Sequence, residues 1–295
     1  MTLIEFIESQ AARLKQAGVS FGHGTTNAFD EAAWLVMWSL GMDLDELEPH
    51  AKRPVSADEQ AKAEALVAKR IETRQPAAYL TKEAWLQNVP FYVDERSIVP
   101  RSFIAELLAD GEGTGELDAW LSDRTHAVLD LCTGNGSLAV IAAMAYPEVI
   151  VDAADISDDA LAVARINVDK HKLGKRITLI KSDLLAGVKG PYDLILCNPP
   201  YVNSRSMSEL PEEYRHEPAL ALAGGEDGMD LVRQILRDAP AKMTPEAVLV
   251  LEIGNERAHF EHAFRRLEVA WLETSAGADQ VLLVTRDALA RWSRA

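Results

Sequence analysis

The chain is poor in cysteine and in positive charge. Among its 295 residues there are 2 cysteines, and 30 lysines and arginines stand against 46 aspartates and glutamates, which gives a net charge of −16. Cys132 and Cys197 are too few for a disulfide scaffold, and each ends a buried-strand pattern, which favours a reduced thiol in the core. The excess of acid argues against a protein that mainly grips naked nucleic acid, and it favours a basic partner.

Membrane and metal signals are also missing. No apolar run approaches the roughly 20 residues of a membrane-spanning helix, and the segment from Met1 to Gln10 carries acids where a secretory signal has basic residues. We therefore expect no membrane partner and a location in the reducing cytoplasm. The histidines are scattered and no cysteine or carboxylate completes a zinc set, so we predict no metal.

The first part of the chain has the apolar spacing of helices. Ser56, with Glu59 three residues later, forms a capping-box pattern at the start of a helix that we expect to run to about Thr73. The apolar faces of such helices must pack on something, so residues 1–80 are interpreted as a small helical domain. Residues 81–102 follow as a linker with a short predicted hairpin.

From residue 126 onward, strand-like runs alternate with helical patterns, which predicts an α/β fold with a doubly wound sheet. Continuous apolar runs such as Val248–Leu251 are typical of strands covered on both faces. The last two strands are joined by a link too short for a helix, so we expect antiparallel neighbours and a mixed sheet. The predicted strands span residues 127–131, 149–154, 177–180, 192–197, 247–251, 269–272 and 281–284.

A Gly-x-Gly turn follows the first of these strands, and carboxylates follow the first three. Asp130 precedes the turn, Asp155 ends the second strand and Asp183 follows the third. Asp155 is placed to accept from ribose hydroxyls and Asp183 from an adenine amino group, whereas Asp130 repels a pyrophosphate but can hold a cation. No Walker-type lysine is present, and Cys132 occupies the opening glycine position of a dinucleotide fingerprint. The pattern suits S-adenosylmethionine, which carries a sulfonium and an ammonium group.

The predicted cofactor-binding residues are Asp130, Cys132, Thr133, Gly134, Asn135, Gly136, Asp155, Ile156, Asp183, Leu184 and Asn198.

The fourth strand ends in Asn198-Pro199-Pro200-Tyr201. After the glycine turn, this resembles the Asn-Pro-Pro-Tyr motif of methyltransferases that alkylate an amino group on a planar carbon, among them DNA adenine and protein glutamine methyltransferases. The resemblance implies that the Asn198 side-chain oxygen and the Pro199 carbonyl accept the two N–H bonds of the target nitrogen. Tyr201 is then expected to stack on the planar group. The catalytic residues implied are Asn198, Pro199 and Tyr201.

Other segments resemble the protein-(glutamine-N(5)) methyltransferase family. This resemblance extends from about residue 75 to the C-terminus and is specific over that range. Residues 75–80, 90–93 and 99–101 are similar to the linker of that family. Pro100-Arg101-Ser102, Cys132 and the stretch 201–218 look like the branch that modifies large-subunit ribosomal protein uL3. The resemblance implies a Rossmann-like class I methyltransferase with a mixed seven-stranded sheet, a helical substrate-recognition domain at 1–80 and a cofactor-binding catalytic domain at 103–295.

The implied reaction is N(5)-methylation of a glutamine amide on uL3 during ribosome assembly, and an acidic enzyme fits this basic substrate. The same reaction on the Gly-Gly-Gln loop of release factors is the near alternative. An adenine methyltransferase acting on nucleic acid and a non-catalytic adenosine-binding assembly factor remain further alternatives. Beside the four motif residues, Arg101 and His216 are predicted to contact substrate or to order loops. The segment Gly224–Gly228 is interpreted as a possible lid.

Overall fold

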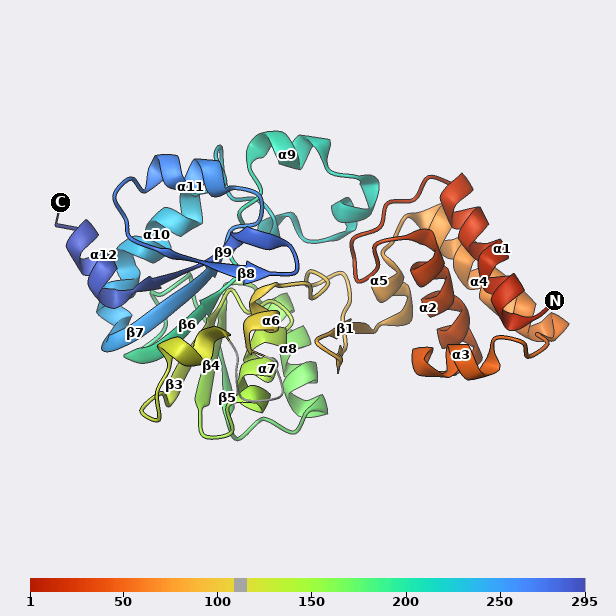
Figure 1. Ribbon diagram of the computed structural model, residues 1–295, viewed down its shortest axis with the longest axis horizontal. Coiled ribbons are helices and arrows are strands. Elements are labelled where there is room, and N and C mark those ends of the chain that lie inside the picture. Colours follow the sequence, from red (N-terminus) through yellow and green to blue (C-terminus); the bar gives the residue numbers. More distant parts are fainter. Residues whose placement is uncertain (109–115, 295) are drawn as a thin grey trace.

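The computed structural model describes residues 1–108 and 116–294. A group of helices at the N-terminal end lies beside a larger sheet-containing part, and the chain crosses between them near β1 (Figure 1). Among the described residues, no helix is both long enough and apolar enough to cross a bilayer.

The N-terminal helices pack around their own apolar core. The Ser56 hydroxyl accepts from the Glu59 N–H and the Glu59 carboxylate accepts from the Ser56 N–H, so the predicted capping box is confirmed. Leu3, Phe6 and Ile7 are buried in this core. The helices are α1 (Leu3–Gln16), α2 (Ala28–Leu40), α3 (Leu47–His50), α4 (Ala57–Thr73) and α5 (Ala77–Thr81).

The predicted hairpin of the linker is present. Strands β1 (Ala84–Leu86) and β2 (Val89–Phe91) pair antiparallel. The two residues between them, Gln87 and Asn88, have φ values of 48° and 59°, the left-handed geometry that a two-residue hairpin turn requires. The buried Asn167 side chain accepts from the N–H of Tyr92 and donates to its carbonyl oxygen, which fixes the linker on the larger part.

Seven strands form one mixed sheet in the order β5-β4-β3-β6-β7-β9-β8. Neighbours from β5 to β7 are parallel, and β9 is antiparallel to both β7 and β8, as the short link between the last two strands predicts. The strands are β3 (Ala127–Leu131), β4 (Ile150–Asp155), β5 (Ile177–Lys181), β6 (Tyr192–Cys197), β7 (Met243–Glu252), β8 (Ala270–Thr274) and β9 (Gly277–Thr285).

Both faces of the sheet are buried, which explains the continuous apolar runs. In β6, Leu194 and Leu196 pack with one core and Ile195 and Cys197 with the other. The first core includes side chains of α6 (Ile104–Leu108) and α7 (Ser137–Ala145), with α8 (Asp158–Lys170) beside them. The second core includes side chains of α10 (Asp230–Asp238), α11 (Arg257–Ala263) and α12 (Arg286–Trp292).

The connection between β6 and β7 is long and positions the site. It carries α9 (Ser204–Glu209) and the short turns η3 (Glu212–His216) and η4 (Ala219–Ala221), and it reaches toward the N-terminal helices (Figure 1). Since β3 has β4 on one side and β6 on the other, the carboxyl ends of these strands form the topological switch point where open α/β sheets bind ligands.

Candidate active site

The glycine turn after β3 is built on a buried carboxylate. Asp130 Oδ2 accepts from the Thr133 hydroxyl and, over 2.9 Å, from the Ala139 N–H. Its other oxygen, Oδ1, is buried and has no hydrogen-bond partner among the described residues. Burial raises the pKa of Asp130 to about 7. A carboxylate oxygen left free beside the turn fits the cationic group of S-adenosylmethionine.

The turn itself needs left-handed backbone and close packing. Gly134 and Gly136 have φ values of 55° and 81°, and a Cβ on Gly136 would lie 3.1 Å from the Cβ of Ala164. Cys132 has a φ of 61° although it carries a side chain. The main-chain carbonyl of Asn135 accepts from Asn167, which joins the turn to the linker.

A cavity opens above this turn. Asp155 accepts from the N–H groups of Gly134 and Ser157, each over 2.9 Å, and these bonds orient its carboxylate. Burial raises the pKa of Asp155. Seven of the predicted cofactor residues line the cavity: Cys132, Gly134, Asp155, Ile156, Asp183, Leu184 and Asn198. The other four do not line it: Asp130 lies in β3, and Thr133, Asn135 and Gly136 lie in the turn that follows.

Part of the cavity wall carries no sequence signal. Arg96–Ile98 of the linker and Pro218, Leu220 and Ala221 of the β6–β7 connection also line it. We did not predict these residues as cofactor contacts, and only the folded chain brings them to the cofactor side.

Asn198 lies where this cavity meets a second one. Asn198, Ile98 and Ala221 line both cavities, while Pro199 and Tyr201 line the second and Pro200 lines the first. The motif therefore separates the two cavities. We predicted Pro200 as a substrate contact, and the structure places it on the cofactor side.

Tyr201 is held firmly in the second cavity. Its hydroxyl donates to Glu252 Oε1 over 3.2 Å, and Glu252 Oε2 accepts from the Ser102 hydroxyl and the Phe103 N–H. A Cβ on Gly254 would lie 2.5 Å from the Tyr201 ring. Burial raises the pKa of Glu252.

The segment Gly224–Gly228 lies against the residues that follow the motif, and its interpretation as a lid stays a prediction. The Gly224 N–H donates to the Val202 carbonyl over 2.9 Å, and the Asp230 N–H donates to the Gly224 carbonyl over 3.0 Å. Asp227 forms an ion pair with Arg233. These contacts place the segment beside the motif.

Arg101 lines the second cavity, but its guanidinium is already engaged. It donates to both oxygens of Glu217, over 2.6 and 2.7 Å, and to the Val99 carbonyl over 3.1 Å. Glu217 also accepts from the Val99 N–H and lies 3.5 Å from Nε2 of the buried His23. This geometry favours the loop-ordering interpretation of Arg101.

His216 lies in η3 and lines neither cavity. The next residue, Glu217, is buried and contacts Val99, Arg101 and His23. Sequence reasoning missed His23, whose only signal is its place between two glycines in an otherwise helical region. Its ring lies 4.3 Å from that of Tyr214, centroid to centroid.

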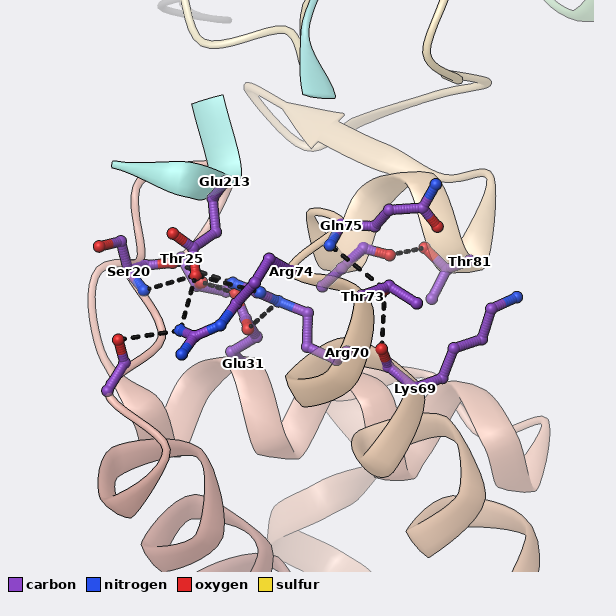
Figure 2. A network of polar contacts seen from close by, with 12 residues as sticks. Ser20, Thr25, Glu31, Lys69, Arg70, Thr73, Arg74, Gln75, Thr81 and Glu213 are labelled. Carbon is purple, nitrogen blue, oxygen red and sulfur yellow. Dashed lines mark hydrogen bonds and ion pairs between the residues drawn. The ribbon is translucent and has the colours of Figure 1, made fainter. Parts of the chain in front are cut away.

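A second buried charge network joins η3 to the N-terminal helices (Figure 2). Glu213 accepts from the Ser20 N–H over 2.9 Å and lies within 3.5 Å of both Arg70 and Arg74. Arg70 also pairs with Glu31 over 2.8 Å. The network holds the loop between α1 and α2 against the β6–β7 connection. Four residues of that loop, Gly22, Gly24, Thr25 and Thr26, line the second cavity.

No group of three or more histidine, cysteine, aspartate or glutamate side chains within residues 1–108 and 116–294 is arranged to hold a metal ion.

Two family models match the chain: the PrmC N-terminal domain over residues 5–81 and the methyltransferase small domain over residues 112–214. Curated proteins named ribosomal protein uL3 glutamine methyltransferase are similar over nearly their full length. The protein from Bordetella pertussis is 50% identical, with 98% of this chain and 96% of the relative covered. The protein from Burkholderia pseudomallei is 50% identical, and the match covers 96% of this chain and 94% of the relative. The protein from Neisseria meningitidis serogroup B is 47% identical, and the match covers 98% of this chain and 94% of the relative. The chain therefore belongs to the family of protein-glutamine methyltransferases that includes these proteins.

Proposed function

We propose that the chain transfers a methyl group from S-adenosylmethionine to the side-chain amide nitrogen of a glutamine in ribosomal protein uL3. One observation carries the proposal: Asn198 lines both the cavity above the glycine turn and the second cavity. An amide nitrogen held at Asn198 from the second cavity therefore faces the first. The names of the relatives, at 47–50% identity, support uL3 as the substrate.

The reaction requires positioning more than base catalysis. An amide nitrogen is a poor nucleophile because its lone pair is delocalised. When bound, S-adenosylmethionine supplies an electrophilic methyl carbon on sulfur. In our proposal Asn198 Oδ1 and the Pro199 carbonyl accept the two N–H bonds and aim the lone pair at that carbon. These hydrogen bonds strengthen as positive charge develops on nitrogen, so they stabilise the transition state more than the ground state.

Residues around the motif limit its movement. Glu252, Gly224 and Gly254 lie against Tyr201, which we propose packs on the planar amide. Asp155 and Asp183, which line the first cavity, are proposed to hold the ribose and the adenine. Asp130, whose Oδ1 has no partner among the described residues, is proposed to hold the cationic end from beside the cavity. We further propose that residues 1–80 recognise the protein substrate and that 103–295 carry catalysis, in the cytoplasm during ribosome assembly.

The test is a substrate competition. The purified chain is given methyl-labelled S-adenosylmethionine with recombinant uL3, a release factor or nucleic acid, and the products are analysed by tandem mass spectrometry. We expect label on one glutamine of uL3. Label on the release factor alone, or in nucleic acid, would contradict the proposal.

A further inference from the structure

The wall of the second cavity that faces the motif comes from the loop between α1 and α2. We define residues 22–26, Gly-His-Gly-Thr-Thr, as the wall segment. Gly22, Gly24, Thr25 and Thr26 line the same cavity as Asn198, Pro199 and Tyr201. A substrate that brings its amide to Asn198 through this cavity therefore comes near the wall segment.

The main chain of the wall segment is available for binding. Among the described residues, none forms a hydrogen bond with a main-chain N–H or C=O group of residues 22–26. Two of the five positions are glycines with φ values of 132° and 102°, a backbone geometry that residues with side chains rarely adopt. Main-chain groups without a partner among the described residues thus belong to a segment that lines the cavity, and free main-chain groups are a common means of peptide recognition.

The wall segment is nevertheless held in place, because two of its side chains, those of His23 and Thr25, contact residues outside the segment. His23 is buried against Tyr214 and Glu217. The Thr25 hydroxyl donates to Glu31 over 3.1 Å. Just before the segment, Arg70 donates to the Ser20 carbonyl and Glu213 accepts from the Ser20 N–H, as Figure 2 shows for the charge network.

We propose that the wall segment binds the main chain of the protein substrate beside the target glutamine. The occupant is a polypeptide loop of a basic protein, because free N–H and C=O groups match a peptide backbone and the chain carries a net charge of −16. This inference rests on the proposed function, since it takes the second cavity as the glutamine site. It places part of the substrate specificity on the N-terminal helical region.

The first test needs no variant. Amide hydrogen exchange of the wild-type chain is measured with S-adenosylhomocysteine, with and without recombinant uL3. We expect slower exchange at residues 22–26 when uL3 is bound. Unchanged exchange there, from a preparation that methylates uL3 when S-adenosylmethionine is supplied instead, overturns the inference. If a release factor is methylated in place of uL3, the proposed function fails. The exchange measurement is then repeated with the release factor, and it tests separately whether the wall segment binds the substrate main chain.

The second test uses Gly24→Ala with Gly41→Ala as its matched control. Both glycines have positive φ, but Gly41 ends α2 and has nothing within 4 Å of an added Cβ. Alanine rarely adopts the φ of 102° found at Gly24, so Gly24→Ala should shift the main chain of the wall segment. We expect the shift to break one or two of the proposed hydrogen bonds to the substrate main chain and to raise KM for uL3 by about tenfold. The kcat and the affinity for S-adenosylhomocysteine should match those of Gly41→Ala. Equal KM values for the two variants contradict the inference.

Discussion

Arg70 and Glu213 lie 143 residues apart in the sequence, yet Arg70 Nη1 lies 3.5 Å from Glu213 Oε1 and both side chains are buried. This contact ties the N-terminal helices to the connection that follows the Asn-Pro-Pro-Tyr motif. It is part of a network with two positive and two negative side chains, so the buried charges compensate one another.

Glu213→Ala should therefore lower stability. Removing one partner of a buried ion pair leaves an uncompensated charge, which typically costs about 3 kcal/mol or more. The adjacent Glu212 is exposed, and Glu212→Ala should change the free energy of unfolding by less than about 0.5 kcal/mol. Urea unfolding of the two variants measures the difference. Equal midpoints would show that the network does not hold the two parts together.

Asp130 should make cofactor binding depend on pH. Its pKa is raised to about 7 by burial, so the carboxyl group of the free protein is largely protonated below that pH. A cationic ligand favours the ionised form, so binding below pH 7 requires release of a proton and the affinity falls as the pH falls. Calorimetry with S-adenosylmethionine should show roughly tenfold weaker binding at a pH about one unit below 7 than on the plateau above it.

Asp130→Asn is the control for that pH dependence. The amide does not titrate, so the affinity of this variant should be weak and nearly constant over the same range. A wild-type affinity that is also constant would remove Asp130 from contact with the cationic group.

Gly224 should be intolerant of any side chain. An added Cβ would lie 2.6 Å from the Tyr201 Cα and 2.7 Å from the Gly228 carbonyl, so the motif backbone would have to move. Gly224→Ala should cost about 2 kcal/mol of stability, as overpacking does, and should reduce methylation. Gly174→Ala is the control: its added Cβ would lie 4.0 Å from the nearest atom, Asp169 Oδ1, so this variant should behave as wild type. Thermal unfolding and initial rates check both variants, and an active Gly224→Ala would refute the tight packing.

The sheet could be predicted because its signals are local. The apolar runs of β3 and β6 match the predicted boundaries, and the short link before β9 predicts the antiparallel pair. β7 begins at Met243, earlier than expected, because polar and proline residues at its start hide the strand pattern.

The site could be predicted only in part. Asn198 and Asp155 occur in motifs at strand ends, where topology alone brings them together. The contacts of Glu217 with His23 and Arg101 join segments about a hundred or more residues apart, and no periodicity or spacing reports such pairs. Fold-specific loop packing therefore decides the walls of both cavities.

The most direct measurement of the central claim is the methylation rate of Asn198→Ala on recombinant uL3, together with its affinity for S-adenosylhomocysteine. Loss of a hydrogen bond that strengthens in the transition state should lower kcat by roughly 100-fold or more. Cofactor affinity should change little, and exposed Asn255, replaced by alanine, should leave both values at wild type. A wild-type kcat in Asn198→Ala would contradict the proposal that this side chain holds the reacting amide.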